Sequence, residues 1–110
     1  MANYKFSKEA DKDLVKIYEY TILNFGYSQA KTYSQNLYSK IQSLANKQIK
    51  GRKADIIQVG LRRIEVGSYI ILYNEEPNVI FIVRILHNNM DIRKHIFEDN
   101  MYPLTVSGNP

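Results

Sequence analysis

Apolar side chains recur at spacings of three and four between positions 7 and 25, which places them on one face of a helix of about five turns. Ser7 can cap the first turn, and Glu9 and Asp11 follow where the helix dipole favours acidic groups. Gly26 ends the pattern and is suited to the left-handed conformation that closes many helices. The residues of this face are Ala10, Leu14, Ile17, Tyr18, Ile22 and Phe25.

The same spacing predicts a second helix, capped by Ser28, that runs to about Leu44. Its apolar face holds Ala30, Tyr33, Leu37, Ile41 and Leu44. Because only the joint at Gly26 separates the two helices, the first half of the chain is predicted to be a helical hairpin, preceded by a short strand over residues 3–6.

After a connecting loop over residues 46–60 the pattern changes to that of strands. LRRIEV, YIILYN and VIFIVRIL are β-rich, and the two-residue Gly67–Ser68 link and the EEPN turn separate them. HNNMDIRKHIF, which follows, is predicted to leave the sheet as a short helix.

These elements predict an α+β domain of order β-α-α-β-β-β, in which the α-hairpin packs on one face of an antiparallel sheet and a short C-terminal helix follows. The domain is expected to span residues 1–98, and residues 99–110 are expected to form a loose tail.

Both faces of the last strand are apolar, although the hairpin can cover only one of them. Simple alternation places Ile80, Ile82, Arg84 and Leu86 together on the uncovered face. Such a face favours a protein partner, unless the tail folds back over it. This is the physical basis of the predicted binding surface.

Composition narrows the classes of protein. The 110 residues include no cysteine, which excludes disulfides and thiolate chemistry and favours a cytoplasmic protein. The longest apolar run is too short to cross a bilayer, so no membrane association is expected. The net charge is +4, and seven of the fifteen basic residues lie between positions 40 and 63, where Asp55 is the only acid. This segment is either a solvated loop or an anion-binding face.

His87, Asp91 and His95 follow one another at intervals of four, a spacing that would suit a metal on a helix. His87 stands at a strand end, however, where helical geometry is not yet established. A surface hydrogen-bond network is the more common role of such residues. We therefore predict no metal and no cofactor.

Acid–base chemistry on RNA would need a base near neutral pKa with cations beside it, and Arg62, Arg63, Arg84 and His87 are the candidates. Only one of the adjacent Arg62 and Arg63 can share a face with Arg84. Tyr69 and Tyr73 share a strand face and are suited to stacking on bases, or, more commonly, to the half-buried rim of a small core.

The chain resembles the ParE branch of the RelE/ParE toxins of bacterial type II toxin–antitoxin systems. The resemblance covers nearly the whole chain and is carried by YKFSKEADKDLVKIYEYT, FGYSQAKTYSQNL, LRRIEVGSYIILYNEE and, most specifically, IVRILHNNMDIRKHI. It implies a small toxin that assembles with a cognate ParD-like antitoxin, which wraps across it. ParE-like members typically trap DNA gyrase without being catalysts, whereas RelE-like members are ribosome-dependent endoribonucleases.

The residues favour the gyrase branch, because Ile70 stands where the nuclease branch tends to carry an arginine. No catalytic residue is therefore predicted; the nuclease alternative would use Arg62, Arg84 and His87, and a basic nucleic-acid-binding module is a third class. Arg84 is expected to make bidentate contacts with a partner carboxylate. The predicted partner-binding residues are Arg62, Arg63, Tyr69, Tyr73, Ile80, Ile82, Arg84, Leu86, His87, Asp91 and His95.

Overall fold

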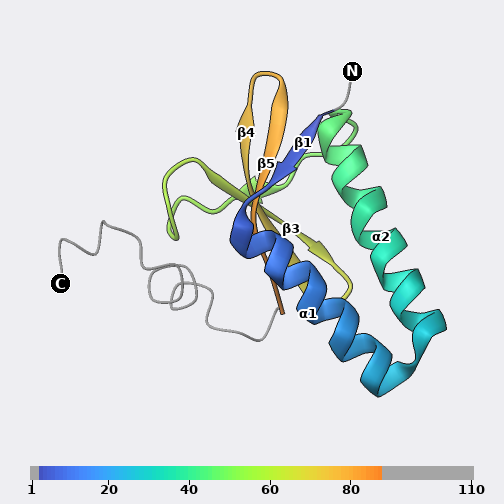
Figure 1. The fold of residues 1–110 in the computed structure, drawn as a ribbon. Helices are drawn as coiled ribbons and strands as arrows, with labels where there is room; N and C mark the ends of the chain where they lie inside the picture. Colours follow the sequence, from blue (N-terminus) through green and yellow to red (C-terminus); the bar gives the residue numbers. More distant parts are fainter. Residues whose placement is uncertain (1–2, 88–110) are drawn as a thin grey trace, which may run out of the picture.

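The computed structural model describes residues 3–87, which form two helices packed against one twisted sheet (Figure 1). The elements in chain order are β1 (Tyr4–Phe6), α1 (Lys8–Phe25), α2 (Tyr27–Ala45), β2 (Arg52–Lys53), β3 (Leu61–Val66), β4 (Tyr69–Glu76) and β5 (Val79–His87). The predicted α+β class and the helical hairpin are confirmed. The predicted C-terminal helix and tail lie outside the described residues.

Helix α1 begins as its sequence predicts. The Ser7 hydroxyl accepts a hydrogen bond from the backbone N–H of Ala10 at 2.9 Å, and Glu9 and Asp11 lie in the first turn. The buried face is more polar than the pattern suggested, because Asp13 and Thr21 are buried on it beside Ala10 and Ile17. Phe25, by contrast, lies exposed at the end of the helix.

The joint between the helices is a single residue. Gly26 has φ +92° and ψ 168°, a region that is essentially restricted to glycine, and its N–H closes α1 on the carbonyl of Ile22. Helix α2 then begins at Tyr27 without a side-chain cap, so the prediction that Ser28 caps it is wrong. Because Gly26 makes the turn by itself, Ser28 already lies inside the helix.

The sheet has the order β1-β5-β4-β3-β2. Strands β3, β4 and β5 form the predicted antiparallel meander, with two-residue turns at Gly67–Ser68 and Pro77–Asn78. The sheet is mixed, however, because β1 pairs parallel to β5. The short edge strand β2, antiparallel to β3, lies in the segment predicted to be a loop.

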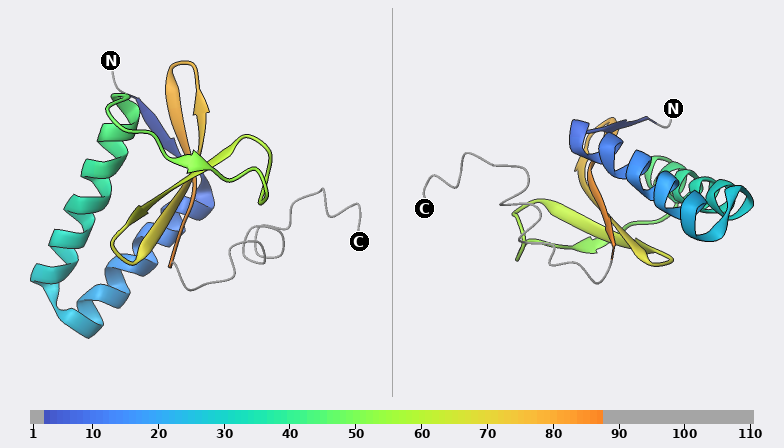
Figure 2. Two further views of the ribbon diagram at one scale, coloured as in Figure 1. Left: turned by 180° about the vertical axis from the view of Figure 1, so that it is seen from behind. Right: turned by 60° about the horizontal axis from the view of Figure 1, so that its bottom comes forward.

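The sheet has a hydrophobic core on each face. On one face, helices α1 and α2 cover Ile71, Tyr73, Ile80 and Ile82. On the other face, Ala54 and Ile57 pack with five sheet residues, which are Leu61, Ile70, Leu72, Val83 and Leu86. Figure 2 shows the segment between β2 and β3 on the side of the sheet away from the helices.

The prediction that one apolar face of the sheet is left uncovered is therefore wrong. Ile80, Ile82 and Leu86 are only 4 %, 0 % and 3 % exposed. They do not share a face either: Tyr73 pairs with Ile82 but Leu72 pairs with Arg84, so Val83 is an extra residue on β5. A bulge of one residue reverses the inward and outward alternation, which the sequence pattern could not reveal.

No helix among residues 3–87 is both long and apolar enough to span a membrane.

Candidate partner-binding site

Arg84 lies in the interior, bound to a carboxylate of the same chain. Its Nε donates a hydrogen bond to Oδ2 of Asp13 at 2.8 Å, and its Nη2 donates to Oδ1 at 3.0 Å. Both residues are 7 % exposed. The bidentate geometry expected of Arg84 is present, but the carboxylate that accepts it belongs to Asp13 of α1, where the sequence predicted a carboxylate of a partner.

The same carboxylate closes the edge of β5 where β1 ends. Oδ2 of Asp13 also accepts the backbone N–H of Ile85 at 2.9 Å. At the N-cap of the same helix, the Ser7 hydroxyl donates to the carbonyl of Val83 at 2.6 Å, and the Ser7 N–H donates to the carbonyl of Ile82. Helix α1 thus satisfies backbone groups that a longer β1 would otherwise bind.

Sequence reasoning missed Asp13, although a signal was present. Asp13 follows Ala10 by three residues and precedes Ile17 by four, so it occupies the buried stripe of α1. A carboxylate in such a stripe needs a cation or several N–H donors, because an unpaired buried charge is costly. Arg84, the single cation within the VIFIVRIL strand, was its natural partner.

Arg62 and Tyr73 form a second internal network, which fixes the chain before β2. The Tyr73 hydroxyl accepts the N–H of Gly51 at 2.7 Å, and Arg62 Nη1 donates to the carbonyl of Gly51 at 2.8 Å. Arg62 also lies 3.7 Å from Glu75. Burial raises the pKa of Tyr73, although the bond from Gly51 opposes that shift, so the phenol is held neutral.

The two tyrosines do not form the half-buried rim that the sequence favoured. Tyr69 and Tyr73 are both in the core under the helices. Tyr69 packs edge-to-face with Tyr33 of α2 and with His87, at ring-centroid distances of 5.9 and 5.4 Å. Burial raises the pKa of Tyr69 as well. Neither tyrosine presents a free ring face to a base.

Cations gather at the β2 and β3 edge of the sheet, where three are exposed and Arg63 is half-buried. We call Lys50, Arg52, Lys53 and Arg63 the basic margin. Arg52 Nη2 lies 2.8 Å and Arg63 Nη2 3.1 Å from the same oxygen of Glu65, while Lys50 lies 3.5 Å from Glu75. Burial by itself would raise the pKa of Glu65, but the hydrogen bonds and charges of Arg52 and Arg63 outweigh it and hold that pKa below its usual range.

The three residues of the nuclease alternative are not brought together. Arg62 stands opposite Tyr73 on β4, whereas His87 stands opposite Tyr69, four residues away along that strand or roughly 13 Å. The guanidinium of Arg84 is buried against α1. Asp91 and His95 lie outside the described residues, so their part in a site stays a prediction.

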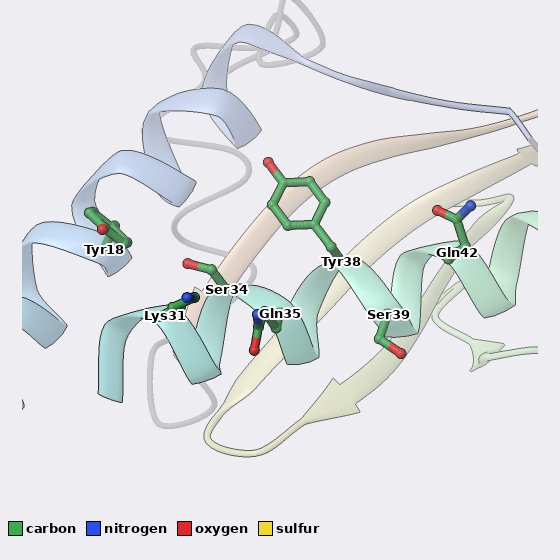
Figure 3. Close-up of a pocket in the computed structure, with 7 residues that line it drawn as sticks. All are labelled: Tyr18, Lys31, Ser34, Gln35, Tyr38, Ser39 and Gln42. Atoms are coloured by element: carbon green, nitrogen blue, oxygen red, sulfur yellow. The ribbon is translucent and has the colours of Figure 1, made fainter. Parts of the chain in front are cut away.

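A shallow groove of about 480 Å³ runs between the outer surfaces of the helices (Figure 3). Tyr18 of α1 borders it on one side. Side chains of α2 form the rest, among them Lys31, Ser34, Gln35, Tyr38 and Gln42. Aromatic side chains with a largely uncharged polar rim suit an amphipathic segment of another polypeptide better than a phosphate group.

The chain is similar to known toxins over most of its length. A family model described as "ParE toxin of type II toxin-antitoxin system, parDE" matches residues 4–92. Toxin ParE1 of Caulobacter vibrioides is 31 % identical over 96 residues, which cover 87 % of this chain and 99 % of that protein. Toxin ParE1 of Mycobacterium tuberculosis is 30 % identical over 96 residues, covering 86 % and 98 %.

The fold is also found among solved structures. A chain from a structure titled "Chromosomal ParDE TA system from P. aeruginosa" superposes with a TM-score of 0.67 at 22 % identity, covering 79 % of this chain and 96 % of that one. The superposition shows that the two chains share the same overall fold. The protein belongs to the ParE family of toxins of type II toxin–antitoxin systems.

Proposed function

We propose that this toxin acts in the cytoplasm by binding DNA gyrase and stopping its catalytic cycle, and that a cognate ParD-like antitoxin neutralises it. Membership of the ParE family supports the general role. The choice of binding over RNA cleavage depends on the described residues themselves.

One observation carries that choice. The cations that a nuclease would need are engaged in separate internal contacts: Arg84 with Asp13, and Arg62 with Gly51 and Glu75. Stabilising the charge that develops on a phosphate requires donors aimed at one point. Side chains held apart in this way support a surface that binds, not a catalytic centre.

The active surface that we propose consists of the basic margin together with the segment that begins at His87 and includes Asp91 and His95. Arg63 keeps part of its side chain exposed, and His87 is half-buried at the end of β5. Arg62, Tyr69 and Tyr73 support this surface from within by fixing the strands beneath it. Arg84 has the same supporting role, through Asp13.

The antitoxin is proposed to occupy the groove between the helices. An amphipathic helix could place its apolar residues against Tyr18 and Tyr38 and its polar residues against Ser34 and Gln42. Such a complex would join the two chains at this groove.

Purified toxin added to gyrase and relaxed plasmid should suppress supercoiling and accumulate cleaved DNA. In the same assay His87→Ala should retain most of the inhibition, because a single residue at the margin of a binding surface contributes only part of the affinity. A nuclease that relies on His87 would instead lose about a hundredfold or more in rate.

Two results would contradict the proposal. Unchanged supercoiling, with cut messenger RNA appearing when translating ribosomes are added, would establish the endoribonuclease alternative. Direct duplex binding that weakens steeply with salt, with no effect on gyrase or on growth, would establish a nucleic-acid-binding module.

A further inference from the structure

The segment between β2 and β3 exposes two aliphatic side chains almost completely. Ile56 is 83 % and Val59 87 % exposed, whereas the neighbouring Ala54 and Ile57 are buried in the core of the far sheet face. We call residues 54–60 the aliphatic loop. Isolated apolar residues on a surface are common, but a pair on one short loop is a candidate contact element.

The aliphatic loop is held by its own hydrogen bonds. The N–H of Ala54 bonds the carbonyl of Leu61 at 2.8 Å, and the N–H of Ile57 bonds the carbonyl of Ala54 at 2.9 Å. The carboxylate of Asp55 accepts the N–H of Gly60 at 3.0 Å. Because the backbone is fixed and Ile57 anchors it, Ile56 and Val59 are presented without a large loss of entropy on binding.

The surroundings of the loop are basic. Lys53 immediately precedes it in β2, next to Arg52, whose side chain is 68 % exposed in spite of its contact with Glu65. Asp55, the acid within the loop, accepts the N–H of Gly60 and keeps its charge, but the two cations of β2 outnumber it. An occupant that places apolar atoms on Ile56 and Val59 would therefore meet the basic margin at its rim, which favours carboxylates there.

The aliphatic loop and the groove between the helices lie on opposite sides of the sheet. The loop packs on the face formed by Ile70 and Leu72, whereas the helices cover the face formed by Ile71 and Tyr73. The right-hand view of Figure 2 shows this separation. A polypeptide bound in the helical groove would leave Ile56 and Val59 accessible to a different protein.

We propose that the aliphatic loop contacts the protein that this toxin inhibits, with Ile56 and Val59 inserted into an apolar recess whose rim carries carboxylates. The inference rests on the proposed function, which supplies a target that is inhibited by binding. DNA is the less suitable occupant, because a phosphate backbone offers no apolar recess for the two exposed aliphatic side chains.

The test compares Ile56→Ser/Val59→Ser with the wild type in growth arrest on expression and in inhibition of purified gyrase. We expect both effects to weaken by about tenfold or more, because burying two aliphatic side chains is worth several-fold each in affinity. The thermal midpoint should be unchanged, because neither side chain is packed. Leu23→Ser is the matched control: Leu23 is 84 % exposed at the far end of α1 and should retain full toxicity.

A charge series sharpens the test. Lys53→Glu should weaken growth arrest more than Lys53→Gln does, because it places a carboxylate against carboxylates on the partner.

Equal toxicity of Ile56→Ser/Val59→Ser and the wild type would overturn the inference while leaving gyrase inhibition intact. A wild-type chain that arrests growth without inhibiting gyrase would overturn only the proposed target, provided that the double variant is harmless. If the wild type binds a bare DNA duplex and the double variant does not, the loop contacts nucleic acid, and the proposal of a protein occupant is overturned.

Discussion

The two edges of the sheet use the same chemical pair in different ways. At the β5 edge, Arg84 and Asp13 form a buried bidentate pair that also accepts a backbone N–H of the strand. At the β2 and β3 edge, Arg52 and the half-buried Arg63 share the exposed carboxylate of Glu65. Removing one member of a buried ion pair leaves the other charge uncompensated in the interior. Removing one member of an exposed pair costs little, because water solvates the charge that remains. Breaking the first pair is therefore expected to destabilise the fold, whereas the second pair keeps its cations at the surface, where a partner can reach them.

Asp13→Ala should show the largest effect. It leaves the buried guanidinium of Arg84 without its carboxylate and the N–H of Ile85 without an acceptor, so the free energy of unfolding should fall by about 3–5 kcal/mol. Chemical denaturation followed by circular dichroism measures this change.

The double variant Asp13→Leu/Arg84→Leu keeps that prediction testable even if Asp13→Ala does not fold. Replacing both charges by apolar groups should recover most of the lost stability, because no unpaired charge remains. A loss of less than about 1 kcal/mol for Asp13→Ala would contradict the contrast between the edges, since that is the usual value of an exposed pair.

Tyr73→Phe tests the hydrogen bond that joins the chain before β2, and with it the basic margin, to the core. It leaves the buried N–H of Gly51 without its acceptor, which should cost about 1–3 kcal/mol in denaturation experiments. Tyr38→Phe, at an exposed position on α2, is the matched control and should change little.

The raised pKa of Tyr73 gives that prediction a pH dependence. The contribution is fully present below the pKa of a tyrosine in the unfolded chain, about 10, and is lost as the pH rises above it, because the unfolded state releases the proton first. Tyr73→Phe should reduce this alkaline loss of stability, and an unaltered alkaline profile would contradict it.

Ser7→Ala should have an intermediate effect. It removes the cap of α1 and the hydroxyl that donates to Val83, so we expect a loss of about 0.5–2 kcal/mol. Ser28→Ala is a pointed control, because sequence reasoning gave Ser28 the same capping role and the structure does not. Equal losses for the two variants would contradict the assignment of the caps.

Glu65→Gln should have the smallest effect on stability, about 0.5 kcal/mol or less, and less still at high salt. The pKa of Glu65 is lowered in the folded chain. Its contribution is therefore present above the pKa of an unfolded glutamate, about 4.3, and is lost as the pH falls through the lower folded value. The difference between wild type and Glu65→Gln should vanish in acid; a difference that grows there would contradict the assignment.

Local patterns in the sequence were sufficient for most elements. Apolar spacings of three and four predicted α1 and α2. Ser7 indicated the N-cap of α1, and Gly67 indicated the hairpin between β3 and β4. These features depend on contacts between residues that are near in the chain, which is why a pattern can reveal them. The two-residue strand β2 has no such pattern, because it exists only by pairing with β3.

The candidate site was predicted less well, because its contacts are long-range. The bulge at Val83 placed Ile80 and Leu86 on different faces, and α1 supplied the carboxylate that occupies Arg84. Asp13 and Arg84 are 71 positions apart, and a period within one element cannot show such a pairing. The aliphatic loop was likewise predicted only as a connecting loop, because its sequence shows no sustained period. The burial of Ile57 and the exposure of Ile56 and Val59 depend on packing against the sheet.

By itself, the sequence determined the helical hairpin, the antiparallel meander, the absence of cysteine chemistry and the resemblance to ParE toxins, because each depends on residue type and local order. Only the tertiary structure decided which cations remain accessible. Arg84 meets the buried Asp13, whereas Arg52 and Arg63 meet the exposed Glu65. Only the buried position makes an unpaired charge too costly, so only Arg84 is withdrawn from the surface.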